Sequence, residues 1–97
     1  ATANPVLMQG AKLVFVDIDE KTFNIDVSKI EEKITDKTKA IIAVDLFGQP
    51  ADYEALDKIA KKHDLQIIED AAQSIGGELN GVKTGALGNL ATFSFFL

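Results

Sequence analysis

The sequence predicts an α/β fold with a mostly parallel sheet of about four strands and flanking helices. Three apolar, β-rich segments, at 12–17, 39–46 and 65–70, alternate with helical patterns, which is typical of βαβ units. Their apolar runs are nearly continuous, as expected for parallel strands covered by helices on both faces. A chain of 97 residues has room for one domain with a modest core. We therefore treat residues 1–97 as a single domain.

The first expected helix and strand occupy the start of the chain. Asn4 and Pro5 resemble an N-cap followed by proline at the first helical position, and Gly10 supplies a stop signal. The apolar segment 12–17 (KLVFVD) is predicted as the first strand. A short helix followed by a strand should therefore open the fold.

Two further helices should connect the expected strands. Asp26 or Ser28 can cap a short helix after the first strand, and 50–64 has the helical spacing of a longer helix before the third. Each helix should pack one apolar face against the sheet. The residues that define these faces are Val27, Ile30 and Ile34 in the short helix and Tyr53, Leu56, Ile59 and Ala60 in the longer one.

The chain changes character after Asp70. Glycines punctuate the stretch to residue 88, and Asn80-Gly81 is a strong tight-turn dipeptide, which predicts a small hairpin or an irregular loop. Segment 89–97 (NLATFSFFL) is predicted as the fourth strand. Its aromatic side chains would need a cover that the chain does not supply, which indicates a piece of a larger protein.

The composition excludes several classes of partner and site. The formal net charge is −5 and the isoelectric point is about 4.7, with no basic face to neutralise a nucleic acid. Cysteine is absent, which excludes disulfides and thiolate metal sites. No apolar run approaches the length of a membrane span, and the first residues lack the features of a signal peptide. We expect a soluble, cytoplasmic protein that binds neither nucleic acid nor membrane.

The strongest functional signal comes from Glu69 and Asp70, on which the apolar run of 65–70 ends. A buried parallel strand that ends on a carboxylate points this charge into the crevice at the carboxyl edge of the sheet, where open α/β sheets bind ligands. From the residues alone, a ligand-binding role is no better supported than a structural one, in which the two carboxylates cap the next turn or face solvent. Gln73 and Ser74, which follow, are more often turn-forming than functional.

Other polar residues give weaker signals. Asp17 and Asp19 lack a third ligand and a nearby histidine, so we predict no metal site. His63 is the only histidine and fits the end of the expected helix, where a cationic residue is favourable. Ser94 has no histidine placed to activate it, so a hydrolase triad is unsupported. The glycines follow neither the dinucleotide nor the P-loop pattern.

Several motifs together resemble one protein family. They are 1–4 (ATAN), 15–19 (FVDID), 46–52 (LFGQPAD), 70–74 (DAAQS), 85–88 (GALG) and 92–96 (TFSFF). In this order and spacing, essentially the whole chain closely resembles the DegT/DnrJ/EryC1/StrS sugar aminotransferases, which are pyridoxal-phosphate enzymes of fold type I. The resemblance implies that residues 1–97 form the central part of an incomplete large domain, the cofactor-binding domain of the aspartate aminotransferase-like fold.

The resemblance implies four cofactor-binding residues. Asp70 matches the aspartate of the family's D-x-A-[QH] motif, which pairs with the pyridine nitrogen and keeps it protonated, so that the ring is a stronger electron sink. Gln73 matches the position near the cofactor's 3-oxygen, where an amide can donate, and Ala72 would pack its methyl group against a ring face. Ser94 matches the serine of the F-S-[FY] segment, whose hydroxyl donates to the cofactor phosphate.

The resemblance assigns no catalytic residue to this chain. The Schiff-base lysine of the family lies beyond Leu97, and Leu97 itself stands about where the family has a proline. The N-terminal segment and the C-terminal small domain are also expected outside residues 1–97. Catalysis by this chain alone is therefore not expected, because the covalent anchor and the proton-transferring base are missing.

The resemblance also implies partners and a defect in the sheet. The complete enzyme would transfer an amino group, commonly from glutamate, to a keto group on a nucleotide-linked sugar of undetermined identity. In the parent fold, a strand that precedes Ala1 lies between 12–17 and 39–46. Without that strand, two unpaired edges face an empty slot. We expect the ordered form to associate, as a homo-oligomer or with the missing segments.

Two other interpretations stay open. A flavodoxin-like or receiver-like module would bind a phosphate-bearing partner through magnesium. It should gather Asp17, Asp45 and Asp70, which end three expected strands. A purely structural fragment would share the fold and have no function of its own.

Overall fold

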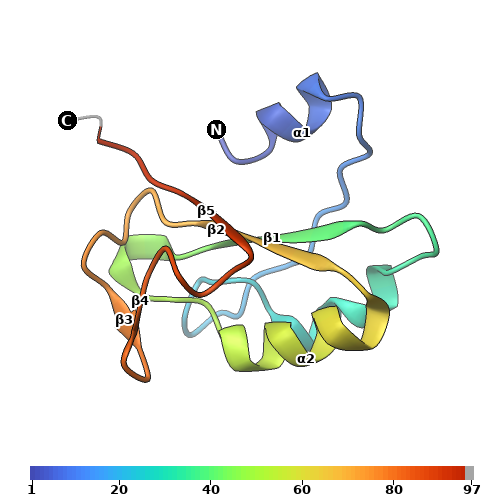
Figure 1. Cartoon of the computed structure of the whole chain (residues 1–97). Coiled ribbons are helices and arrows are strands. Elements are labelled where there is room, and N and C mark those ends of the chain that lie inside the picture. The colour runs from blue at the N-terminus through green and yellow to red at the C-terminus, as the bar shows by residue number, and fades with distance from the viewer. Residues whose placement is uncertain (96–97) are drawn as a thin grey trace.

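Three parallel strands form the sheet in the part of the chain that the structure describes. The structure is a computed structural model that describes residues 1–95. Strand β1 (Ala40–Val44) pairs with β2 (Gln66–Asp70), and β2 pairs with β5 (Leu90–Thr92), so β2 lies in the centre (Figure 1). The α/β class and the parallel arrangement are confirmed. Within residues 1–95 the parallel sheet has three strands, one fewer than the expected number of about four.

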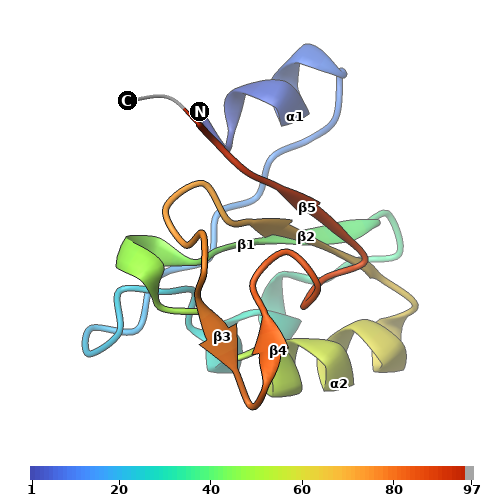
Figure 2. The ribbon, with the colours of Figure 1, turned by 60° about the vertical axis from the view of Figure 1, so that its left-hand side comes forward.

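Helix α2 (Tyr53–His63) connects β1 to β2 and covers one face of the sheet (Figure 2). The helix begins where the Asp52 carboxylate accepts the N–H of Ala55 at 3.1 Å, and it ends at Asp64, which has a left-handed backbone. Its apolar face packs on the strands as predicted. The core formed in this way includes Ile30, Ile41, Ala43, Ala51, Tyr53, Leu56, Ile59, Ala60, Leu65 and Ile67.

The opposite face of the sheet is thinly covered within residues 1–95. Helix α1 (Asn4–Met8) lies on this side, as Figures 1 and 2 show, and none of its five described residues is buried. The strand side chains on this face are half-buried or exposed, and Leu90 has 67% of its surface accessible. The expectation of helices packed on both faces is therefore wrong for the described residues. None of the helices in this part of the chain has the length and apolar character needed to cross a bilayer.

The connection between residues 26 and 34 forms two short 3₁₀ turns in place of the expected helix. These are η1 (Val27–Lys29) and η2 (Glu31–Lys33). Asp26 is the cap, as predicted, because its carboxylate accepts the N–H of Ser28 at 3.0 Å. Ile30 lies between the two turns and is buried in the core, and its N–H donates to the carbonyl of Val27 at 3.4 Å with the three-residue spacing of a 3₁₀ turn.

The predicted hairpin is present. Strands β3 (Glu78–Leu79) and β4 (Val82–Lys83) pair antiparallel around Asn80 and Gly81. Both turn residues have positive φ, 50° and 83°, as a tight turn of this kind requires. The Asn-Gly signal therefore located the turn correctly.

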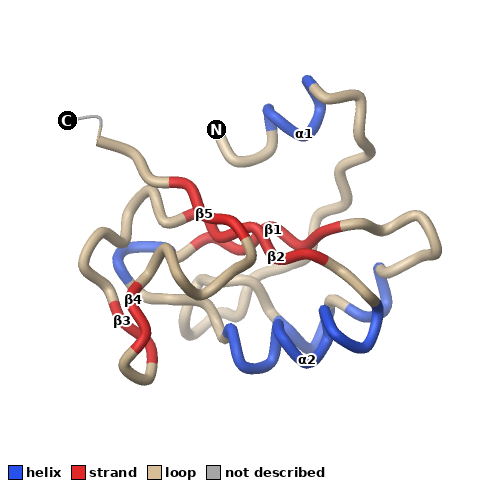
Figure 3. The backbone as a smooth tube through the Cα atoms, viewed as in Figure 1, coloured by secondary structure: helices blue, strands red, loops and turns tan. Residues whose placement is uncertain are grey.

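Segment 12–17 is not a strand, which corrects the prediction. A strand needs neighbouring backbone groups, and none of the described residues forms a ladder with this segment (Figure 3). Its nearest approach to pairing is an isolated bridge between Ile18 and Ile25. Val14 and Phe15 remain 48% and 72% exposed. The apolar run that predicted a strand thus lacks, within residues 1–95, the neighbour that would pair with it.

The last strand is shorter than predicted. Strand β5 ends at Thr92, and Phe93 and Phe95 are 43% and 81% exposed. Phe96 and Leu97, the last residues of the predicted strand, lie outside the described residues.

The buried carboxylate of Glu69 fixes the loop that leads into β5. Its Oε1 accepts the N–H of Gly85 at 2.6 Å, and its Oε2 accepts those of Leu87 and Gly88 at 3.0 and 3.2 Å. Glu69 has no accessible surface. These three bonds compensate the burial of the carboxylate and attach loop 85–88 to the central strand.

The first prediction concerns association. The outer edge of β1 and the backbone of 12–17 have no ladder partner within residues 1–95, and unpaired edges favour strand pairing between chains. We expect sedimentation velocity to show this 97-residue chain associating at micromolar concentration when it is folded. A well-folded monomer under these conditions would contradict the prediction.

The second prediction concerns Glu69. Glu69→Gln replaces an acceptor oxygen by an NH₂ donor facing backbone N–H groups, so we expect it to destabilise the fold by about 2–4 kcal/mol. Chemical denaturation at one fixed protein concentration measures the effect. Glu54→Gln is the matched control, because Glu54 is exposed and accepts from the side chain of Asn80 at 2.8 Å, with no buried backbone donor among its partners in residues 1–95. Equal stability of the two variants would show that the Glu69 bonds are not structural.

Candidate functional site

The candidate site lies at the carboxyl edge of the parallel sheet. Val44, Asp70 and Thr92 are aligned in register at the ends of β1, β2 and β5. The backbone continues this alignment one residue further, because the N–H of Asp45 donates to the carbonyl of Asp70 at 3.0 Å and the N–H of Ala71 donates to the carbonyl of Thr92 at 2.9 Å. The residue that ends β2 is therefore flanked on both sides by strand ends.

Asp70 faces away from the core, on the thinly covered side of the sheet. Side chains alternate along β2, so the buried Ile67 and Glu69 point toward α2, whereas Ile68 and Asp70 point to the other side. The Asp70 carboxylate is half-buried. Asp70 thus ends the central described strand at the carboxyl edge of the sheet, where the sequence analysis expects this carboxylate.

Both carboxylate oxygens of Asp70 are engaged. Oδ2 accepts the hydroxyl of Thr2 at 2.5 Å, and Oδ1 accepts the N–H of Ala72 at 3.2 Å. These two bonds hold the carboxylate from the N-terminal segment and from the turn that follows β2. A carboxylate has about four lone-pair sites, so Asp70 retains the capacity to accept a further hydrogen bond.

Gln73 lies in the turn that follows Asp70. The N–H of Ser74 donates to the carbonyl of Ala71 at 3.1 Å and closes this turn. Gln73 is exposed, and its Oε1 accepts the N–H of Phe47 at 3.1 Å. The amide oxygen is thus occupied by a backbone donor, and the NH₂ group is the part of the side chain left to donate.

The other two predicted residues follow the same strand ends. Ala72 is exposed and lies directly between Asp70 and Gln73 in the turn. Ser94 is exposed and comes two residues after the end of β5, the strand next to β2. The fold therefore places all four predicted residues at or just after the carboxyl ends of two adjacent strands.

Asp45 is the polar group of this edge that the sequence analysis did not assign to the site. It is fully buried, and its Oδ1 accepts the N–H of Ala51 at 3.0 Å and the hydroxyl of Tyr53 at 2.9 Å. Its Oδ2 accepts the hydroxyl of Ser74 at 3.5 Å. The signal that could have found it is its place as the first residue after an apolar strand, next to the 46–52 motif.

Burial controls the protonation of this network. Desolvation raises the pKa of the Asp45 carboxyl to about 6, and the neighbouring Glu69 adds to the rise. Burial and the Asp45 charge raise the pKa of the Tyr53 hydroxyl well above its usual range, so Tyr53 is a neutral donor. Asp45 is therefore suited to a structural role at this edge.

The acidic cluster required by a receiver-like module does not form in residues 1–95. Asp17 has a side chain that is 75% exposed and lies 3.8 Å from the Lys29 ammonium group, Asp45 is buried, and Asp70 faces the other side of the sheet. The described residues contain no group of three acidic, histidine or cysteine side chains that could hold a metal ion. His63 binds Glu31 at 2.9 Å near the end of α2. These placements remove the support for the magnesium-binding interpretation.

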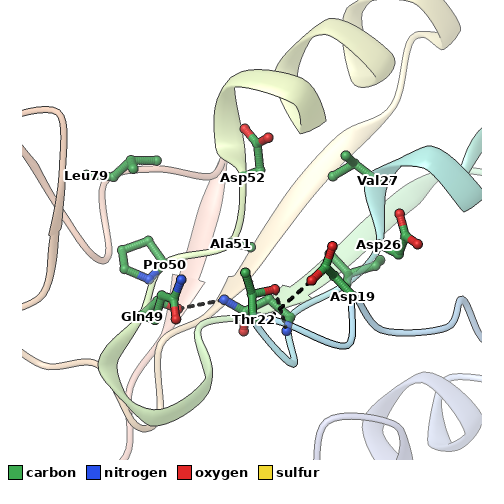
Figure 4. Close-up of a pocket in the computed structure, with 11 residues that line it drawn as sticks. Asp19, Thr22, Asp26, Val27, Gln49, Pro50, Ala51, Asp52 and Leu79 are labelled. Carbon is green, nitrogen blue, oxygen red and sulfur yellow. Dashed lines mark hydrogen bonds between the residues drawn. The ribbon is translucent and has the colours of Figure 1, made fainter.

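A separate pocket of about 280 Å³ lies beside the 19–27 and 49–52 loops (Figure 4). Asp19, Thr22, Gln49 and Asp52 are among its lining residues, and Asn24 connects its two sides by donating to the carbonyl of Gln49 at 2.9 Å. None of the four predicted cofactor-binding residues lines this pocket. The pocket is therefore separate from the predicted cofactor-binding residues.

Comparison with known proteins decides the family. The sequence model of the DegT/DnrJ/EryC1/StrS aminotransferase family matches residues 1–97. The chain belongs to this family. The resemblance of the short motifs is therefore confirmed over the full length of the chain.

Relatives of this family member differ in their described activities. The chain is 58% identical over 96 residues to a pleiotropic regulatory protein of Geobacillus stearothermophilus and 49% identical over 96 residues to a GDP-perosamine synthase of Caulobacter vibrioides. It covers 26% of each of these proteins, and each match includes 99% of this chain. It is also 48% identical over 92 residues to a GDP-4-keto-6-deoxy-D-mannose 3-dehydratase of Yersinia pseudotuberculosis, with 95% and 23% of the two chains covered.

A solved structure supports the same fold. The aminotransferase from Psychrobacter cryohalolentis superposes with a TM-score of 0.94 at 40% identity, over 97% of this chain and 24% of that one. This family member thus spans about a quarter of the length of the relatives that it matches. Its fold corresponds to one part of a fold type I aminotransferase.

The third prediction concerns the pH dependence of stability. The pKa of Asp45 in the folded state, about 6, lies above its ordinary value of 3.8. The stability that this group contributes is therefore fully present below about pH 4 and is lost as the pH rises through 6. In wild type, the unfolding free energy should therefore fall by at most about 3 kcal/mol between these pH values. Asp45→Asn should not show this fall.

Denaturation curves of both proteins at several pH values measure this difference. Asp57→Asn, which changes an exposed carboxylate on α2, is the control and should keep the fall. The same pH profile in wild type and Asp45→Asn would contradict the prediction.

Proposed function

We propose that the complete protein is a pyridoxal-phosphate-dependent aminotransferase that acts on nucleotide-linked keto sugars, with glutamate as the amino donor. One observation carries this proposal. Asp70 ends the central described strand of a family member, and its half-buried carboxylate is held by two hydrogen bonds while it keeps the capacity for a third. The relatives that bear nucleotide-sugar names support the substrate class.

The residues present fit the cofactor. A carboxylate suits a protonated pyridine nitrogen, a free NH₂ group suits a phenolate oxygen, and an exposed methyl group between them can contact a flat ring. Asp70, Gln73 and Ala72 supply these groups within one turn, and the Ser94 hydroxyl can donate to a phosphate. When it is bound, pyridoxal phosphate supplies the electron sink for the bond changes at the amino-bearing carbon.

The chain's own residues then have separate tasks. Asp70 accepts the pyridine N–H and keeps the proton on the ring nitrogen, and Thr2 and Ala72 hold the carboxylate in place for this bond. Gln73 donates to the 3-oxygen and orients the ring. We also propose that residues 1–97 do not carry out the reaction by themselves, because none of them matches the family's Schiff-base lysine. The cytoplasmic location stays a prediction.

The fourth prediction tests this function in the complete protein. Asp70→Asn replaces the charged acceptor by a neutral amide, so we expect amino transfer to fall by about a hundredfold or more, as on loss of a key electrostatic contact. Asp57→Asn, at an exposed position of α2, is the control and should keep wild-type activity. Assays with nucleotide-linked keto sugars and glutamate measure amino transfer, and the products distinguish amino transfer from loss of water.

Two results would contradict the proposal. One is an Asp70→Asn enzyme with wild-type activity. The other is a complete wild-type protein that develops no visible absorbance when pyridoxal phosphate is added. That result would favour the alternative in which the chain has a structural role and no function of its own.

A further inference from the structure

The loop after β1 has an unusual backbone next to the candidate site. This loop, residues 46–49, contains the 3₁₀ turn η3 (Leu46–Gly48). Phe47 has φ 56° and ψ 28°, and Gly48 has φ 86°. A left-handed backbone suits glycine but costs a bulky residue such as phenylalanine about 1–2 kcal/mol.

Burial of the Phe47 ring does not explain this conformation. The ring is at the surface, with 78% of the residue accessible within the described structure. The strain must therefore be compensated by bonds to the backbone of the loop. Strained non-glycine residues of this kind cluster at functional sites, where the surrounding structure holds them in place.

Two buried polar side chains hold the loop at both ends. The Asn24 side chain accepts the N–H of Leu46 at 3.0 Å and donates to the carbonyl of Gln49 at 2.9 Å, so one amide bridges the entry and the exit of the loop. Asp45 precedes the loop and accepts the N–H of Ala51, which follows it. Asn24 and Asp45 have 4% and 0% of their surface accessible.

The fixed loop directs one donor at the site. The N–H of Phe47 donates to Oε1 of Gln73 at 3.1 Å, across 26 residues of sequence. A backbone N–H can only donate, so the atom that faces it has to be the amide oxygen and not the NH₂ group. The loop thereby fixes the orientation of the Gln73 amide, with its oxygen toward Phe47 and its NH₂ group on the other side.

We propose that Phe47 is a positioning residue, whose left-handed backbone aims its N–H at Gln73 and so presents the Gln73 NH₂ group to the 3-oxygen of the cofactor. This inference rests on the proposed function, because it needs a ligand that accepts from Gln73. In the opposite orientation, the amide oxygen would face the 3-oxygen and repel it. The backbone conformation of Phe47 positions the Gln73 amide, and the phenylalanine ring has no part in this role.

A matched pair of variants of the complete protein separates the backbone from the side chain. Phe47→Gly and Phe47→Val both remove the ring, but glycine accepts a left-handed backbone and a β-branched residue disfavours it. We expect Phe47→Gly to keep the wild-type dissociation constant for pyridoxal phosphate. Phe47→Val should weaken binding about tenfold, as for the loss of one hydrogen bond. Phe47→Asn should rescue binding, because asparagine tolerates this backbone.

A spectroscopic readout distinguishes positioning from general destabilisation. Gln73→Glu keeps an acceptor for the Phe47 N–H but removes the donor, so it should shift the pH midpoint of the bound cofactor's visible absorbance upward. Phe47→Val should shift the midpoint in the same direction, and Phe47→Gly should leave it in place. If Phe47→Val does not fold, Asn24→Asp provides the second test, since it removes the donor to Gln49 and loosens the same loop.

Hydrogen exchange of the Phe47 amide in the apoprotein tests the contact without the cofactor. Exchange should be slow in wild type and in Gln73→Glu, and at least about tenfold faster in Gln73→Ala. The inference is overturned if Phe47→Gly and Phe47→Val behave alike, or if the Phe47 amide is not slowed in wild type. If the exchange results hold but Gln73→Glu leaves cofactor binding and absorbance unchanged, the donor role of Gln73 is wrong and the inference fails with it. The Asp70→Asn assay described above then judges the proposed function separately.

Discussion

Three backbone N–H groups of loop 85–88 donate to the buried Glu69 carboxylate and attach the segment before β5 to the central strand β2. Loop 85–88 leads directly into β5, and β5 is what flanks β2 on the side opposite β1. These bonds act together with the β2–β5 ladder, so they help to keep the end of β5 beside Asp70. A buried charge therefore contributes to the position of the exposed one beside it.

Consecutive carboxylates take opposite tasks because a strand alternates its faces. Glu69 points into the core, where every oxygen must find a donor, and Asp70 points to the open side, where an oxygen can stay available. Within residues 1–95, no buried side-chain nitrogen or oxygen lacks a partner. A ligand can therefore reach the half-buried Asp70 carboxylate, whereas the Glu69 carboxylate is enclosed by the protein.

The sequence predicted the parts of the fold that local chemistry determines. Helix α2, the strands β1 and β2 and the Asn80-Gly81 turn follow from periodicity, capping and turn residues. The strand predicted at 12–17 was wrong, because a strand needs a neighbouring chain segment to pair with, and composition does not reveal whether one is present. The place of Asp45 after an apolar strand could have marked it, but its bond to Ser74 could not be predicted, because Ser74 is distant in the sequence. The left-handed Phe47 could not be predicted for the same reason, since the contacts that hold its loop come from Asn24 and Gln73.

The charges at this edge also favour one kind of ligand. Asp45, Glu69 and Asp70 lie at the ends of adjacent strands, and backbone N–H groups stabilise the two buried ones. Such bonds make the burial of negative charge tolerable, but they do not remove its long-range potential, which is weakly screened in a protein interior. A ring that becomes cationic next to Asp70 therefore gains from the Asp70 carboxylate and from the acids behind it. A neutral or anionic ring would gain less, so the charges of this edge are consistent with the protonated heterocycle of the proposed function.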